Sequence, residues 1–111
     1  MSESFITSSR RRVILVVDDE KAIAETLAVI LSRAGFEAHA FLNGLQAVEA
    51  LDHLKPDLLI TDVDMPGMTG IEVAIITRAK LPTCKILLFS GQTATAKLSP
   101  SRKLPACLLG E

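Results

Sequence analysis

Short apolar runs alternate along this chain with segments that have the spacing of amphipathic helices, and this alternation limits its fold more than any other feature. The runs Val13–Val17, Asp57–Thr61 and Lys85–Phe89 are rich in leucine and β-branched residues, which is typical of strands covered on both faces. Residues 37–42 mix charged and ring side chains with alanine, as in a strand with one side partly in water. We therefore expect three central strands and one edge strand.

The intervals between these strands carry helix signals. Gly35 follows a first apolar stripe at the point where a helix would end, and Asn43 is suited to cap a second helix, which Pro56 would end. Thr69 and Glu72 have the capping-box spacing for a third helix. The apolar stripes are Ile23, Leu27, Ile30, Leu31 and Ala34 in the first helix, Val48, Leu51 and Leu54 in the second, and Ile71, Ala74 and Ile75, expected to face inward, in the third.

Strands joined by short connections through helices favour right-handed crossovers and a parallel sheet with helices on both faces. The fold class that we predict is therefore α/β, with a doubly wound parallel sheet. A length of 111 residues fits one domain, which we place at residues 11–92, after a loose N-terminal leader over residues 1–10. Residues 93–111 lack a sustained apolar stripe, so we expect an irregular, truncated C-terminal segment there.

Composition argues against several classes of partner and compartment. A formal net charge of -1 and a pI near 6.1 leave no broad positive field, so we expect no direct nucleic-acid binding. The apolar run after Arg10–Arg12 is too short for an export signal or a membrane span, so we expect a cytoplasmic protein without membrane contact. Cys84 and Cys107 have no partner at metal-ligand spacing, which argues against a zinc or redox site.

Acidic and hydroxyl side chains follow three of the predicted strands. Asp18 and Asp19 come after the first strand, Asp62 after the third and Ser90 after the fourth. Because the carboxyl ends of parallel strands meet at one edge of a doubly wound sheet, these groups would converge there. Close carboxylates repel one another unless a cation joins them, and an open site with oxygen ligands suits Mg²⁺. Taken alone, the acidic pair is better explained as a helix N-cap, but the agreement of three strand ends favours the site.

The residues at these strand ends resemble a known family. The resemblance is carried by Asp18-Asp19 after the run VILVV, by the stretch DVDMPGMTG that begins at Asp62, and by Leu88-Phe89-Ser90-Gly91. Together they resemble the receiver domain of two-component response regulators over residues 11–92. This resemblance implies a flavodoxin-like strand order 2-1-3-4(-5), and we expect the fifth strand to be short or absent and the last helix to be missing.

The resemblance also implies a role for each site residue. Asp62 would be the phosphoacceptor, which takes a phosphoryl group from a sensor histidine kinase or a phosphotransfer protein. Asp19 would bind Mg²⁺ directly and Asp18 largely through water, with Asp62 and the backbone carbonyl of Asp64 as further metal ligands. Ser90 would be the switch hydroxyl that turns toward the phosphoryl group. Such a module is a signalling switch rather than a turnover enzyme.

The C-terminal segment departs from the family's pattern, which continues through a fourth helix, a fifth strand that ends in Lys-Pro and a fifth helix. If residues 106–109 form the fifth strand, the family's lysine position falls near Gly110 or Glu111, so we expect no lysine at that position. Without the last helix one face of the sheet would stay uncovered, and a large exposed apolar area marks an association surface. We therefore hypothesise a homodimer through this incomplete C-terminal face.

Two other functions stand beside the switch. An interaction-only pseudo-receiver would keep the acidic pocket but lack a working switch, because the lysine and the final helix are absent. A haloacid-dehalogenase-like phosphatase is suggested by the apolar strand that ends in the D-x-D pattern Asp62-Val63-Asp64. That fold would place the acidic pair on its first strand and needs a later lysine and acidic motif, which makes it the weaker alternative.

Overall fold

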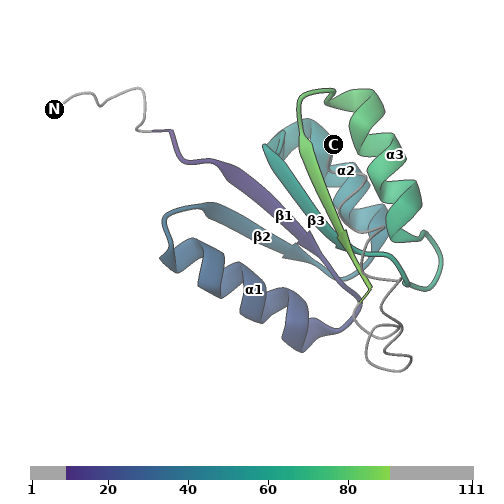
Figure 1. The fold of residues 1–111 in the computed structure, drawn as a ribbon, viewed down its shortest axis with the longest axis horizontal. Helices are drawn as coiled ribbons and strands as arrows, with labels where there is room; N and C mark the ends of the chain where they lie inside the picture. The colour runs from purple at the N-terminus through teal and green to yellow at the C-terminus, as the bar shows by residue number, and fades with distance from the viewer. Residues whose placement is uncertain (1–9, 91–111) are drawn as a thin grey trace, which may run out of the picture.

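The structure of the protein is a computed structural model, which describes residues 10–90. In chain order the elements are β1 (Val13–Val17), α1 (Lys21–Arg33), β2 (Glu37–Phe41), α2 (Gly44–Leu54), β3 (Leu58–Asp62), α3 (Gly70–Lys80) and β4 (Lys85–Phe89). The strands form one parallel sheet in the predicted order β2-β1-β3-β4 (Figure 1). The predicted fifth strand and the family's lysine position lie outside the described residues, and the domain boundaries stay predictions.

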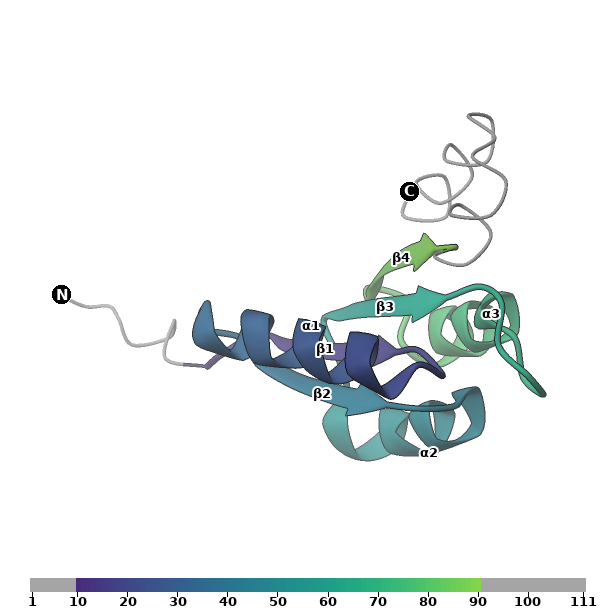
Figure 2. The same ribbon diagram turned by 90° about the horizontal axis from the view of Figure 1, so that it is seen from below.

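The helices cover both faces of the sheet, as Figure 1 and Figure 2 show, with α1 on one side and α2 and α3 on the other. α1 packs against β1 and β2, while α2 and α3 pack against each other and close the main apolar core. The largest side chains of that core are Leu15, Val17, Leu51, Leu59, Met65, Val73, Ile86 and Leu88. Within residues 10–90, no helix has the length and apolar character that a membrane crossing needs.

Burial differs between the central strand and the β4 edge of the described sheet. All five residues of β1 are buried, and β2 is half-buried throughout, as expected for an edge strand. In β4 Lys85 is exposed and Leu87 is 42% exposed, so the prediction that this strand is covered on both faces is wrong for the described residues. The reason is that α1 packs against β1 and β2 rather than against β4.

The predicted helix ends are confirmed. The side chain of Asn43 accepts a hydrogen bond from the backbone N–H three residues on at 2.8 Å, and Thr69 with Glu72 forms the reciprocal capping box. Gly35 follows the end of α1 with a φ of +107°, a left-handed conformation that glycine adopts without strain. α1 begins after Glu20, whose side chain makes no capping hydrogen bond.

The buried face of α3 differs from the prediction. Ala74 is buried as expected, but Ile71 and Ile75 are 38% and 64% exposed, so their predicted inward position is wrong within the described residues. The stripe that is buried consists of Gly70, Val73, Ala74 and Thr77. Both stripes have helical spacing, and the close contact of the first residue of α3 with the end of β3 selects the rotation that buries the smaller side chains.

Candidate functional site

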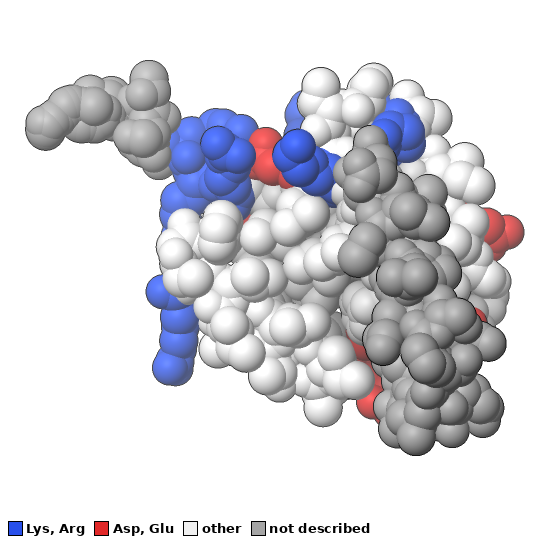
Figure 3. Space-filling view, viewed as in Figure 1, with Lys and Arg blue, Asp and Glu red and all other residues white. Residues whose placement is uncertain are grey.

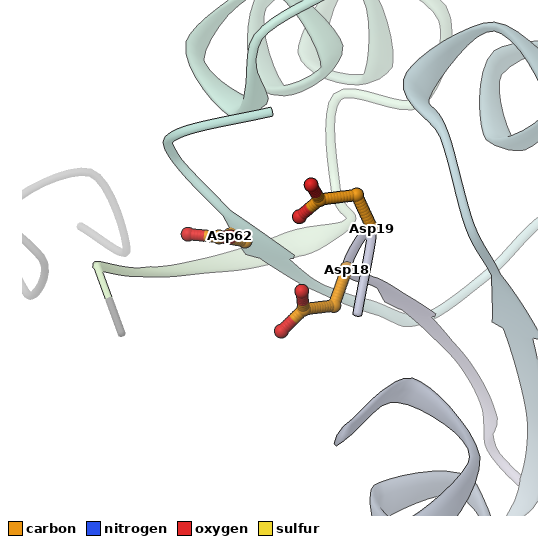
Figure 4. A group of neighbouring side chains, drawn as sticks. All are labelled: Asp18, Asp19 and Asp62. Atoms are coloured by element: carbon orange, nitrogen blue, oxygen red, sulfur yellow. The ribbon is translucent and has the colours of Figure 1, made fainter. Parts of the chain in front are cut away.

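Strand register brings the predicted acidic residues together. β1 and β3 are parallel neighbours, and the pairing of Val17 with Thr61 places Asp18 and Asp62 at the same level of the sheet. One carboxylate oxygen from each of Asp18, Asp19 and Asp62 can be chosen so that all three lie within 4.8 Å of one another. Figure 4 shows the three side chains extending past the strand ends toward the same side. The edge of the sheet thus holds a cluster of three acidic groups.

Asp62 is the last residue of β3, and the residue is almost fully buried, with 2% of its surface exposed. The pKa of Asp62 is raised to about 6, first by burial and then by the negative charges of Asp18, Asp19 and Asp64. The backbone N–H of Asp64 donates a hydrogen bond to Asp62 Oδ1 at 3.3 Å, which partly offsets the rise in pKa. Asp62 therefore ionises at a higher pH than an ordinary carboxyl group, unless a positive charge is close.

Asp18 is buried to the same extent, whereas Asp19 is exposed. Burial raises the pKa of Asp18 above its ordinary value, and the charge of Asp19 acts in the same direction. The backbone N–H of Glu20 donates a hydrogen bond to Asp18 Oδ1 at 2.9 Å and opposes the rise. Two carboxylates of the cluster are thus shielded by protein, and the third faces water.

This donor set fits a hard divalent cation. The three carboxylates supply oxygen atoms close enough to bind one ion, and oxygen is the ligand that Mg²⁺ and Ca²⁺ prefer. A cation would also remove the penalty that raises the pKa values of Asp18 and Asp62. Exposed Asp19 leaves the cluster open to solvent, which suits Mg²⁺ because this ion retains several of its waters.

Ser90 follows β4 and lies at the same edge of the sheet. Its hydroxyl group donates a hydrogen bond to Asp64 Oδ2 at 3.4 Å. The end of β4 is held there because the backbone N–H of Val63 donates to the carbonyl oxygen of Phe89 at 2.8 Å. The predicted switch hydroxyl therefore contacts the side chain two positions after Asp62.

The sequence pattern of the response regulator receiver domain matches residues 14–104, which is most of the chain. The chain belongs to this family. Receiver domains of response regulators are signalling modules of two-component systems, and the predicted resemblance to this family is confirmed. The acidic cluster of this receiver lies at the carboxyl ends of its strands, where ligands bind in open α/β sheets.

Curated proteins similar to the receiver are longer than this chain. It is 44% identical to the DNA-binding response regulator MtrA of Mycobacterium tuberculosis over 69 residues, which cover 62% of this chain and 30% of that protein. It is 31% identical to the DNA-binding transcriptional regulator NtrC of Escherichia coli over 84 residues, or 76% of this chain and 18% of that protein. The receiver thus spans less than a third of these relatives, whose names state a DNA-binding activity of the whole protein.

Solved structures share the fold of the receiver. The chemotaxis response regulator CheY4 of Vibrio cholerae superposes with a TM-score of 0.73 and 27% identity, over 91% of this chain and 82% of that chain. The receiver domain of the Francisella response regulator 1452 has a TM-score of 0.71 over 91% of this chain and 79% of that one, and at 23% identity it supports the fold alone. The flavodoxin-like arrangement is therefore confirmed for the described strands. The Asp62-Val63-Asp64 stretch begins at the last residue of the third strand, whereas the phosphatase alternative needs it at the end of the first strand.

One residue beside the site, Gly70, could not be recognised from the sequence. Gly70 belongs to the stretch that carries the family resemblance, yet its contact with the main chain of Asp62 depends on how closely α3 approaches β3. No spacing within the sequence reveals that distance. The available signal was a glycine directly after a helix N-cap, where a side chain would ordinarily be tolerated.

Proposed function

We propose that this receiver takes a phosphoryl group onto the carboxylate of Asp62 from a sensor histidine kinase or a phosphotransfer protein, and that the acyl phosphate acts as a signalling switch. The observation that carries the proposal is the buried carboxylate of Asp62 within 4.8 Å of two further carboxylates at the carboxyl ends of β1 and β3. Membership of the receiver family supports the same assignment.

The acidic cluster is the proposed Mg²⁺ site. Asp19, Asp62 and the backbone carbonyl of Asp64 would hold the ion directly, and Asp18 would act largely through water. When bound, Mg²⁺ neutralises the oxygens of the transferring phosphoryl group and holds donor and acceptor in line. The raised pKa values of Asp18 and Asp62 support this assignment, because both carboxylates gain most from a nearby cation.

Asp62 must be ionised to attack phosphorus. With a pKa of about 6 it is mostly ionised at pH 7, so the nucleophile is available without a separate base. Its oxygen forms a bond to phosphorus while the bond from phosphorus to the donor's imidazole nitrogen breaks, and the imidazole leaves and takes up a proton from water. The backbone N–H of Asp64 orients the Asp62 carboxylate through its hydrogen bond to Oδ1.

The hydroxyl of Ser90 is the proposed switch. In this structure it donates to the carboxylate of Asp64 over 3.4 Å, which is long for a hydrogen bond between oxygens. A phosphoryl group on Asp62 brings strong acceptor oxygens to the same edge of the sheet. Ser90 would exchange its partner for a phosphoryl oxygen and draw the end of β4 with it.

Acetyl phosphate tests the proposal, since it transfers a phosphoryl group without a kinase. We expect the protein incubated with acetyl phosphate and Mg²⁺ to gain the mass of one phosphoryl group, and expect Asp62→Asn or a chelator to abolish the gain. Intact mass spectrometry measures the adduct, because the sequence has no Trp or Tyr to report binding by fluorescence. Absence of the adduct with Mg²⁺ and excess acetyl phosphate would favour the interaction-only pseudo-receiver.

A further inference from the structure

Gly70 has no room for a side chain. It is the first residue of α3 and is buried. A Cβ atom built on Gly70 would overlap the carbonyl oxygen of Asp62 and would lie 2.8 Å from the carbonyl carbon of Asp62 and 2.9 Å from the Cα of Val63. All three neighbours are main-chain atoms, which cannot rotate away as a side chain can. Any other residue at this position would therefore force apart the start of α3 and the main chain at the end of β3.

Hydrogen bonds on both sides of Gly70 hold α3 against the end of β3. The backbone N–H of Gly70 donates to the carbonyl oxygen of Val63 at 3.0 Å, so residues 63–70 form a loop whose two ends touch. The capping box of Thr69 and Glu72 fixes the start of α3, with hydrogen bonds of 2.9 and 3.2 Å. The position of α3 is thus transmitted directly to the main chain that carries Asp62.

We propose that Gly70 is a positioning residue for the phosphoacceptor: its missing side chain lets α3 rest on the main chain of Asp62 and Val63, and this contact sets the position of the Asp62 carboxylate and the Asp64 carbonyl. The inference rests on the proposed function of Asp62. A displacement of about 1 Å at a reacting group can reduce a rate by about 10²-fold, so the contact matters for chemistry as well as for folding.

Gly44 provides a matched control within the same chain. It is the first residue of α2, directly after a capping residue, and it is buried like Gly70. A Cβ on Gly44 would meet Cγ2 of Val73 at 2.7 Å and Cβ of Met68 at 3.0 Å, which are side-chain atoms. The same glycine-to-alanine change would therefore strain the packing of α2 against the side chains of Val73 in α3 and Met68 in the preceding loop, without meeting the main chain of Asp62.

The experiment compares Gly70→Ala with Gly44→Ala in the full chain. Urea unfolding measures stability, calorimetric titration measures Mg²⁺ affinity, and intact mass measures the rate of adduct formation from acetyl phosphate. We expect both variants to unfold at lower urea, but only Gly70→Ala to lose about 10²-fold in rate and to bind Mg²⁺ more weakly. A folded Gly70→Ala variant that matches the wild type within twofold in both Mg²⁺ affinity and rate would overturn the proposal.

Failure of the proposed function gives a different result, because the wild type itself would then form no adduct, while the Mg²⁺ titration would still test the role of Gly70. If Gly70→Ala does not fold, amide hydrogen exchange of the wild type can distinguish a positioning role of Gly70 from a purely structural one. We expect Mg²⁺ to slow exchange of the Gly70 amide more than that of the Val73 amide, which donates to Thr69 in the same turn of α3. Equal effects at the two amides would assign Gly70 a structural role alone.

Discussion

Two aspartates near opposite ends of β3 have opposite surroundings. Asp57 precedes the strand, and its carboxylate accepts hydrogen bonds from the backbone N–H of Val13 at 2.8 Å and from the Arg10 guanidinium at 3.0 Å. The hydrogen bond from Arg10 lowers the pKa of Asp57, and the backbone bond acts in the same direction. Asp62 ends the strand among other carboxylates and has its pKa raised to about 6. Two identical side chains five positions apart are therefore shifted in opposite directions.

The opposite pKa shifts indicate that the ionised carboxylate of Asp57 stabilises the fold, whereas that of Asp62 destabilises it. Figure 3 shows Lys and Arg side chains gathered where the strands begin, which is the end of the sheet that holds Asp57. The main chain of Asp57 also joins three strands, since its N–H donates to Val13 and its carbonyl accepts from Lys85. Asp62 has no comparable cation among residues 10–90, so its ionisation at neutral pH costs stability until a cation binds.

The largest expected effect is on metal binding. We expect Asp62→Asn to weaken Mg²⁺ binding by more than about tenfold, because it removes a carboxylate from the cluster. Asp57→Asn changes the same residue type on the other side of the strand and should leave the affinity within about twofold. Calorimetric titration of both variants at pH 7 measures the effect. Equal losses in the two variants would contradict the separation of roles.

The second-largest expected effect is the pH dependence of Mg²⁺ binding. Protons compete with the cation for Asp62, and with a pKa of about 6 only about one in ten of these side chains is ionised at pH 5. We therefore expect the affinity to fall about tenfold between pH 7 and pH 5. Asp57, whose pKa is lowered, stays ionised over this range, so the fold should hold. An affinity that does not change between these pH values would show that Asp62 is not a ligand.

Removing the charge of Asp62 should stabilise the fold. Its pKa is higher in the folded protein than the ordinary 3.8, so its contribution to stability is largest below pH 4 and is lost as the pH rises through about 6. Without Mg²⁺ at pH 7, Asp62→Asn should raise the free energy of unfolding by about 1 to 2 kcal/mol, since one pKa unit corresponds to about 1.4 kcal/mol and solvent at the sheet edge screens part of the effect. Urea unfolding in the presence of a chelator measures it. A less stable Asp62→Asn variant would show that the carboxylate supports the fold.

The smallest expected effect has the opposite sign. Asp57→Ala leaves the N–H of Val13 without its acceptor and should lower the free energy of unfolding by about 1 kcal/mol. Because the pKa of Asp57 is lowered, the stability that its charge provides is present at neutral pH and is lost as the pH falls below about 4. Arg10→Ala, which removes only an exposed partner, should shift the urea midpoint less than Asp57→Ala does. A larger shift for Arg10→Ala would reverse the importance of the two contacts.

The order of the strands came from the family resemblance, whereas the strands themselves and their parallel arrangement were predicted from the alternation of apolar runs and helices. These last two features follow from local pattern, because apolar runs mark strands and parallel strands align their carboxyl ends. Asp18, Asp19 and Asp62 could be located in this way, since each directly follows or ends such a run. The roles of these residues came from the family resemblance rather than from the pattern.

Features that depend on contacts between distant segments could not be predicted. The apolar run of the predicted third strand begins at Asp57, whereas Asp57 precedes β3 and binds Arg10, which lies 47 positions earlier. The inward face of α3 was assigned to Ile71 and Ile75 because larger apolar side chains usually mark the core. The close approach of Gly70 to β3 decided otherwise, and its effect is visible only in three dimensions.

The start of α1 differs from the starts of the other two described helices. The side chains of Asn43 and Thr69 accept hydrogen bonds from backbone N–H groups in the first turns of α2 and α3, whereas the side chain of Glu20 makes no such bond at the start of α1. α1 begins at Lys21, two residues after Asp19, so its amide end adjoins the acidic cluster. Aligned peptide dipoles place about half a positive charge at a helix start. The start of α1 thus supplies a fixed partial positive charge beside the carboxylates. This charge is present before any ion binds, and it cannot dissociate.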